Sequence, residues 1–368
     1  MTATVDTIRQ TTPPDPGGRP AGRAVTLRLG PVSARFRWRA VVVPVVASAV
    51  VVVLGALSLG RGDYPIGIGD VLRTLVGAGE QNQRFVVLDL RAPRTLVGVL
   101  VGMALGLAGA LFQTFARNPL ASPDVLGITQ GASVGAVAAI TLSGGSAGAL
   151  LGGLGVPLAA LLGALGAGAL LFTLAWRSGL DGFRLVLVGI ALWSAGQALT
   201  DWLLTRAQIY DASAAYVWIT GSLNARSWDQ AVPLLLSLAV LVPLALAAGR
   251  VLGVLQFGDD TARGLGVRVS LAQAAVVVVA VLLVATAVAA AGPIAFVALI
   301  VPQVAVRLTG GSRPPLLASA LCGAALVTGA DLLTRTVLPE ALPVGILTAA
   351  VGAPYLLWLL VRGRRTPA

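Results

Sequence analysis

Ten stretches rich in apolar residues run along the chain, and each is bounded by arginines, prolines, glycines or acidic residues. A helix needs about 20 apolar residues to cross the hydrocarbon layer of a membrane, and most of these stretches approach that length. The ten predicted helices cover residues 40–60, 94–116, 126–142, 151–176, 185–205, 231–249, 270–290, 293–308, 315–333 and 343–361. The pattern predicts an all-α polytopic membrane protein with ten transmembrane helices.

Composition supports a membrane protein and excludes several kinds of chemistry. Of the 368 residues, 57% are hydrophobic and 11% charged, whereas soluble domains are about 25% charged. All 26 basic residues are arginine, there is no histidine, and Cys322 is the single cysteine. Without lysine the chain has no Walker A loop, and without histidine it has no Cys/His zinc site. We therefore expect a protein that is not itself an enzyme, holds no metal or cofactor, and depends on another subunit if its transport consumes ATP.

The arginines indicate orientation rather than a nucleic-acid partner, because they separate apolar runs instead of gathering on one solvated face. Residues 1–39 carry seven arginines against Asp6 and Asp15 and are rich in proline and glycine, which predicts a disordered basic tail. Residues 40–361 then form the transmembrane domain, in contact with lipid, and residues 362–368 a short second tail. With both tails cytoplasmic, 18 arginines lie inside and eight outside, which satisfies the positive-inside rule.

Two long outer segments, residues 61–93 and 206–230, contain amphipathic pieces such as residues 68–76. These pieces either lie along the membrane surface or simply connect neighbouring helices. Small residues recur every four positions in two of the predicted helices, at Gly98, Gly102, Gly106 and Ala110, and at Gly155, Ala159, Gly163 and Ala167. Such stripes let helix backbones approach closely, which predicts a tight bundle with the helix of residues 94–116 at its centre.

The predicted spans contain almost no titratable groups. Asp201 and Asp331 lie near the outer ends of their helices, and an ordinary interfacial position explains both. An ion-coupled carrier usually needs such groups near the middle of the membrane, so we expect a neutral pathway that is powered from elsewhere.

The inner segment from Gly258 to Arg268 is predicted to form one short exposed helix. Asp259 suits the positive N-terminal end of a helix and can pair with Arg263 four residues later, and Gly266 can end it. This segment is either a surface that a cytoplasmic partner grips or a solvated linker.

Several motifs resemble those of the FecCD-type (vitamin B12 and iron-siderophore) ABC importer permeases. The resemblance is carried by Arg91-Ala92-Pro93-Arg94-Thr95-Leu96, Gly106-Leu107-Ala108-Gly109-Ala110 with Gln113, Arg117 to Gly127, Gly131-Ala132-Ser133, Gly258 to Val267, Gly292-Pro293-Ile294-Ala295-Phe296-Val297 with Pro302, Ala330-Asp331, and Leu342-Pro343-Val344-Gly345. The motifs agree in order and spacing and cover nearly everything after the basic tail.

The resemblance implies a type II ABC importer permease that works with a second permease subunit, two cytoplasmic ABC ATPase subunits and an extracytoplasmic siderophore-binding protein. It implies ATPase coupling through Gly258, Asp259, Asp260, Arg263, Leu265 and Gly266. It implies docking of the binding protein at Arg91, Arg94 and Arg335, and a translocation path past Asn118, Pro119, Ser122, Gly127 and Gln303. Gln303 departs from the family, which often has histidine there, so the role of that histidine does not transfer.

The implied function is import of an iron-siderophore complex across a bacterial plasma membrane. The Asn118 to Asp124 variant of the motif is similar to permeases for catecholate siderophores such as ferric enterobactin. A cobalamin or heme importer is the alternative within the family, and an ion-coupled carrier or channel is the alternative from another class. The sequence does not distinguish a homodimer from a heterodimer.

Overall fold

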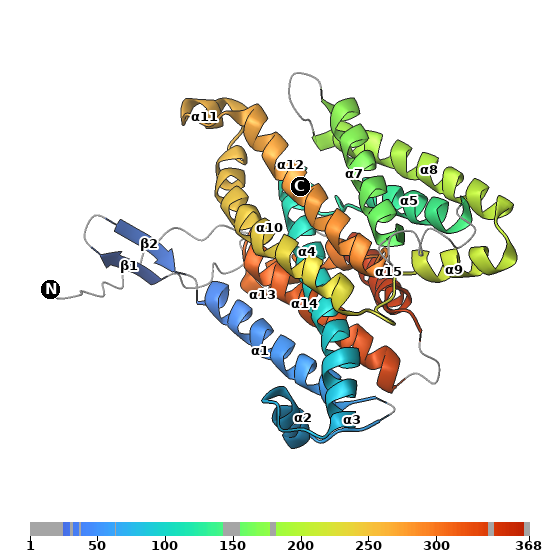
Figure 1. The fold of residues 1–368 in the computed structure, drawn as a ribbon. Coiled ribbons are helices and arrows are strands. Elements are labelled where there is room, and N and C mark those ends of the chain that lie inside the picture. The colour runs from blue at the N-terminus through green and yellow to red at the C-terminus, as the bar shows by residue number, and fades with distance from the viewer. Residues whose placement is uncertain are drawn as a thin grey trace.

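The computed structural model of the chain describes residues 25–29, 32–36, 38–62, 64–142, 155–176, 182–337 and 342–363. In this part of the chain, helices pack side by side into one bundle (Figure 1). The long apolar helices are α1 (Arg39–Gly60), α4 (Ala92–Phe115), α7 (Gly155–Ala175), α8 (Gly182–Arg206), α10 (Trp228–Leu255), α12 (Val269–Ala291) and α14 (Leu316–Thr336). The others are α2 (Ile68–Leu75), α3 (Gln81–Arg84), the π-helix η1 (Phe85–Arg91), α5 (Ile128–Leu142), α9 (Ile209–Ile219), α11 (Asp259–Gly264), α13 (Val297–Thr309) and α15 (Val344–Gly363).

Seven of the described helices are long and apolar enough to cross a membrane. Shorter apolar helices, α5, α13 and α15, stand where the sequence predicts the third, eighth and tenth spans. The structure thus has a polytopic helical fold, and ten crossings stay a prediction.

Helix α4 lies at the centre of the bundle, as its small-residue stripe predicts (Figure 1). It packs against α14, α12, α10 and α13, and most of its residues are buried. A Cβ added at Gly102 would collide with the backbone of Gly323, and one at Gly106 with the backbone of Ser319. The second stripe behaves in the same way, because Gly163 of α7 lies against the backbone of α5. Both stripes are therefore sites of direct backbone contact between helices.

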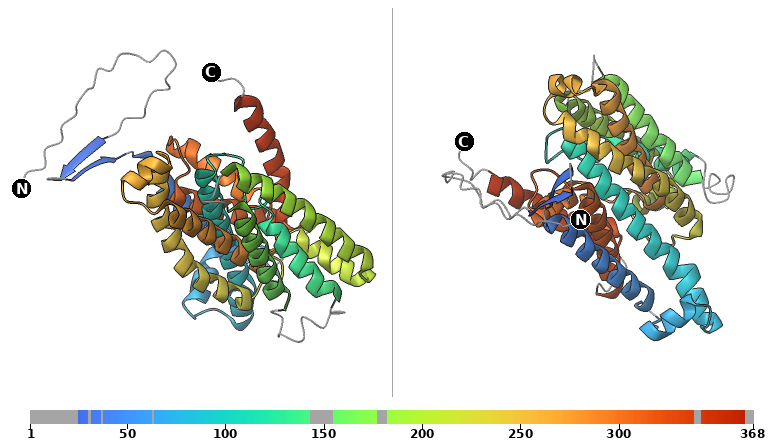
Figure 2. Two further views of the ribbon diagram at one scale, coloured as in Figure 1. Left: turned by 90° about the horizontal axis from the view of Figure 1, so that it is seen from above. Right: turned by 90° about the vertical axis from the view of Figure 1, so that its left-hand side faces the viewer.

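The two long outer segments contain helices. One holds α2, α3 and η1, of which η1 continues into α4 and extends it beyond the bundle (Figure 2). The other holds α9. Interpreting these segments as simple loops is therefore wrong.

The segment predicted to be a disordered tail contains a two-stranded antiparallel hairpin. Strand β1 (Val25–Leu29) pairs with β2 (Val32–Phe36), with Val25 opposite Phe36 and Leu29 opposite Val32. The hairpin projects away from the bundle (Figure 1). The alternating apolar and polar positions of these ten residues are typical of strands, and a disordered tail over residues 1–39 stays a prediction.

Candidate functional site

A buried carboxylate at one end of the bundle holds two of the three arginines predicted to dock a partner. Asp331 of α14 is only 2% exposed. Arg94 of α4 donates to both of its oxygens, with Nη2–Oδ1 2.7 Å, Nε–Oδ1 3.1 Å and Nε–Oδ2 3.2 Å. Arg335, one turn further along α14, places Nε 3.2 Å from Oδ2. Asp331 is thus an internal partner of two cations, not the ordinary interfacial residue that its position in the sequence suggests.

Hydrogen bonds extend this ion cluster to α1. Arg335 donates to the hydroxyl of Ser58, and the hydroxyls of Ser58 and Thr95 are 2.8 Å apart. Both hydroxyl groups belong to buried residues. The cluster therefore fastens α1, α4 and α14 together at the end of the bundle that the sequence assigns to the outside.

The third predicted docking residue, Arg91, is buried in a separate set of contacts. Its Nη1 donates to the carbonyl of Leu59 at 2.8 Å and its Nη2 to the carbonyl of Tyr64 at 2.6 Å. A Cβ on Gly62, whose φ is +147°, would lie 2.9 Å from Arg91 Nη2. Arg91 thus supports the turn after α1, and its guanidinium is not presented to a partner.

At the opposite end, α11 extends beyond α10 and α12 (Figure 1). Gly258 and Gly266, at φ +98° and +82°, flank it, so Gly266 ends the helix in the left-handed conformation as the sequence predicts. Arg263 pairs with Asp260 at 2.9 Å, three residues back, while the predicted pairing with Asp259 lies outside the described side chains. Leu265 is 66% exposed.

One further residue of this surface was missed by sequence reasoning. Phe257 is 73% exposed and precedes the helix, while Ala262 on the helix itself is buried. Exposed aromatic and leucine side chains that flank one surface helix are typical of a contact surface. The signal available in the sequence was an aromatic residue immediately before Gly258, outside every predicted span.

The loop between α4 and α5 carries most of the predicted pathway residues. Asn118 Oδ1 accepts from the backbone N–H of Leu120 at 2.9 Å, so Asn118 and Pro119 lie in a compact turn. Ser122 is buried. Gly127 has φ +78°, and a Cβ there would lie 2.9 Å from the backbone nitrogen of Trp193 in α8, so this position requires glycine.

Asp124 fastens this loop to two helix N-termini. It accepts from the Thr129 hydroxyl at 2.9 Å, near the start of α5, and from the backbone N–H of Phe296, directly before α13. Burial raises the pKa of Asp124, while these hydrogen bonds act in the opposite direction. Sequence reasoning placed Asp124 inside a motif but gave it no role, because its second partner is distant in the chain.

Gln303 of α13 lies apart from that loop and forms a polar contact with the central helix. Its Nε2 donates to Gln113 Oε1 at 2.7 Å, and Gln113 Nε2 donates to the carbonyl of Leu299 at 2.8 Å. Gln113 is buried. The predicted pathway residues therefore comprise four residues of the loop and Gln303, which pairs with Gln113 between two helices.

The described residues include no group of three or more Asp, Glu or Cys side chains that could hold a metal ion. The geometry combines a helical membrane bundle, an internal ion cluster at one end and an exposed surface helix at the other. These features define a polytopic membrane protein of the transport class.

The sequence model of the FecCD transport family matches residues 28–362, and the chain belongs to that family. It is 38% identical over 318 residues to the ferric enterobactin transport system permease protein FepG of Escherichia coli (strain K12), covering 85% of this chain and 94% of FepG. It is 37% identical over 344 residues to the probable siderophore transport system permease protein YfhA of Bacillus subtilis (strain 168), covering 92% and 99%. It is 41% identical to the Fe(3+) dicitrate transport system permease protein FecD of E. coli over 314 residues, covering 84% and 94%.

Comparison with solved structures gives the same fold. A structure assigned to the metal-chelate type of ABC transporter, in an inward-facing conformation, superposes with a TM-score of 0.74 and 28% identity. The match covers 87% of this chain and 99% of the other.

Proposed function

We propose that this chain is the membrane-spanning permease subunit of an ABC importer that moves an iron-siderophore complex into the cytoplasm. The observation that carries the proposal is similarity over nearly the whole length to several permeases named for ferric chelates. ATP hydrolysis belongs to separate ATPase subunits, which agrees with a chain that has no lysine for a Walker A loop. The catecholate class, of which ferric enterobactin is an example, is the preferred cargo because of the match to FepG.

The proposed topology has ten crossings with both termini in the cytoplasm. Seven long helices and three shorter apolar ones support this count. The arginine distribution supports the orientation, which places α11 inside and the Asp331 cluster outside.

The proposed ATPase contact is the surface formed by Phe257, α11 and Leu265. Two exposed apolar side chains at one end of a membrane bundle favour a protein partner over water. The complex is proposed to hold two ATPases, one on each of two permease subunits. Mostly unburied apolar helices such as α8 leave a face for the second permease as well as for lipid.

The proposed contact with the extracytoplasmic binding protein includes two of the three arginines that the sequence suggests. Arg94 and Arg335 have side chains that are 18% and 11% exposed, and one carboxylate shared by two guanidinium groups leaves a net positive charge. An acidic partner would be attracted to that charge, mainly through the association rate. Arg91 is omitted from this proposal because it is engaged with the turn after α1.

Uptake of radioactive iron by a strain that lacks this permease tests the function. Cells carrying the chain together with its ATPase should accumulate iron from ferric enterobactin, and inactivation of the ATPase should abolish uptake. The same uptake assay should be run with ferric hydroxamate, ferric citrate, heme and cobalamin as alternative substrates. Uptake of cobalamin or heme without any ferric siderophore would overturn the proposed cargo.

The carrier alternative predicts a different response. A proton-coupled carrier should stop when Asp201 and Asp331 are neutralised or when a protonophore is added. Asp331 already has two arginine partners, and Asp201 accepts from Gln197 in an exposed position, so neither has the setting of a membrane proton site. Uptake that persists without active ATPase would favour the carrier.

A further inference from the structure

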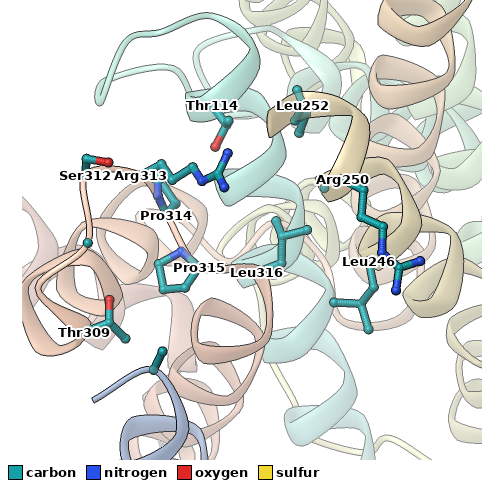
Figure 3. A pocket seen from close by; sticks show the side chains of 13 residues that line it. Thr114, Leu246, Arg250, Leu252, Thr309, Ser312, Arg313, Pro314, Pro315 and Leu316 are labelled. Carbon is teal, nitrogen blue, oxygen red and sulfur yellow. The ribbon is translucent and has the colours of Figure 1, made fainter. Parts of the chain in front are cut away.

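A cavity of about 610 Å³ opens at the end of the bundle that we assign to the cytoplasm (Figure 3). Its walls come from the start of α1, the end of α4, the last turns of α10, and the segment that joins α13 to α14. Ala40, Leu246, Leu252 and Leu316 give it a largely apolar lining. Its volume falls within the range of about 300–1,000 Å³ that is typical of small-molecule sites.

Two arginines supply the charge of this cavity. Arg250 lies on α10, beside Leu246, and Arg313 reaches across from the loop before α14 (Figure 3). A Cβ on Gly253 of α10 would lie 2.9 Å from Arg313 Nη1, so this guanidinium lies directly against α10. No acidic residue in the described part of the chain lines the cavity. Among the described residues, neither arginine forms an ion pair or a hydrogen bond, in contrast to Arg117, which donates to the carbonyl of Leu255.

The two arginines lie at the depth expected for the boundary between membrane and water. Arg250 is five residues from the end of α10, or about 8 Å along a helix. Leu246 lies one turn deeper. Helix α14 also begins at this wall, after Pro315 and without a side-chain cap, so its first N–H groups add to the positive potential.

We propose that this cavity binds an anionic phospholipid of the cytoplasmic leaflet. The phosphate would bind Arg313, since guanidinium groups form strong charge-assisted hydrogen bonds with phosphate oxygens, and Arg250 would add positive charge at the α10 wall (Figure 3). The acyl chains would follow the apolar wall of Leu246 and Leu316 into the membrane. Basic pockets between transmembrane helices on the cytoplasmic side are the general setting for such lipids.

Charge and amphipathic shape favour this occupant over two others. The basic tail of residues 1–39 has seven arginines against two aspartates, so it is repelled by Arg250 and Arg313. Free inorganic phosphate satisfies the arginines but leaves the apolar wall uncovered. The assignment to the cytoplasmic leaflet rests on the proposed orientation. The proposal that this cavity binds an anionic lipid does not depend on that orientation.

Lipid binding is tested on the transporter complex purified from membranes, with the full-length permease. Native mass spectrometry would count retained phosphatidylglycerol, and titration with phosphatidylglycerol, phosphatidylethanolamine or inorganic phosphate would give relative affinities. Wild type should retain phosphatidylglycerol in preference to phosphatidylethanolamine. Arg250→Gln and Arg313→Gln should each weaken that binding about fivefold, and the double variant about 25-fold, from the usual contribution of a basic residue near anionic lipid.

Two further variants separate the possible outcomes. Arg268→Gln removes an exposed positive charge from the same end of the molecule but outside the cavity, and it should leave phosphatidylglycerol affinity unchanged. Leu246→Trp fills the apolar wall, and it should weaken phosphatidylglycerol binding without any effect on phosphate. Equal retention of phosphatidylglycerol by wild type and the double arginine variant would overturn the proposal. Displacement of the lipid by millimolar phosphate, or an equal effect of Arg268→Gln, would also overturn it.

Discussion

Arg94 of α4 and Asp331 of α14 form a two-point ion pair, although they are 237 positions apart in the sequence. Because Asp331 is buried and also pairs with Arg335, its carboxylate is the anion on which two cations depend. The contact joins the central helix of the bundle to the helix that packs most extensively against it.

Loss of that carboxylate should destabilise the bundle. Asp331→Asn leaves Arg94 and Arg335 without their anion, and breaking a buried pair costs about 3–5 kcal/mol. The melting temperature of the purified protein in detergent should fall accordingly. Arg73→Ala is the matched control, since its ion pair with Asp70 is exposed and such pairs contribute about 0–1 kcal/mol. Equal melting temperatures for Asp331→Asn and wild type would show that the cluster is not structural.

The close approach of α4 and α14 gives a second prediction. Gly102→Ala places a methyl group against the backbone of Gly323, and overpacking of this kind costs about 1–3 kcal/mol. Gly166→Ala on α7 has no neighbouring atom within 4 Å, so it should be neutral or stabilise by about 1 kcal/mol through helix propensity. Thermal unfolding of the two variants side by side measures the difference. A harmless Gly102→Ala would contradict the contact.

The hydrogen-bonded pair of Gln303 and the buried Gln113 gives a third prediction. Gln303→Leu removes the donor to Gln113 Oε1, and an unsatisfied buried acceptor costs about 1–3 kcal/mol. Gln197→Leu removes an exposed hydrogen bond to Asp201 and should have little effect. Gln303→His returns a ring N–H and should recover part of the loss. If Gln303→Leu unfolds at the same temperature as wild type, the pair contributes nothing to stability.

The surface around α11 gives a fourth prediction. Leu265→Asp should weaken ATPase association about 30-fold or more, as expected when a central interface residue worth about 2 kcal/mol is lost. Iron uptake should fall with it, while the amount of permease in the membrane stays the same. Leu72→Asp makes the same change on α2, at a similarly exposed leucine, and the ATPase should still co-purify. Normal co-purification with Leu265→Asp would identify the segment as a linker.

Orientation is tested by cysteine labelling in a Cys322→Ser background. Cysteines at Thr4 and Thr366 should resist impermeant thiol reagents in intact cells if both tails are cytoplasmic. Asn224→Cys should react, because Asn224 is exposed in the loop before α10. Ser222 in the same loop is unsuitable, since it is buried. Reaction at one tail alone would refute an even number of crossings, and reaction at both tails would refute the proposed orientation.

Local patterns in the sequence were sufficient where a local interaction decides the structure. Apolar runs located the helices, because a span must satisfy its own backbone hydrogen bonds. The Asp331–Arg335 contact was visible as a pair four residues apart. The Arg263–Asp260 ion pair was not, since three- and four-residue spacings both bring side chains together on a helix.

Contacts between distant segments could not be predicted in this way. Nothing in the residues around Arg94 indicates Asp331, because packing of α4 against α14 brings them together. Burial of Arg91 has the same origin. The hairpin is different, since the alternation of apolar and polar residues in Val25–Leu29 and Val32–Phe36 was present in the sequence but was outweighed by the basic, proline-rich composition around it.

Asp124 connects the starts of two short helices, α5 and α13. Its half-buried carboxylate accepts from the Thr129 hydroxyl at the start of α5 and from the backbone N–H of Phe296 at the start of α13. A motion that pulled the two helices apart would break one of these hydrogen bonds, and a hydrogen bond to a charged group contributes about 1.5–3 kcal/mol. Rotation of both helices together costs none of these bonds. Asp124 thereby couples the loop of residues 118–127 to the N-termini of α5 and α13, so a displacement of this loop would act on both helices.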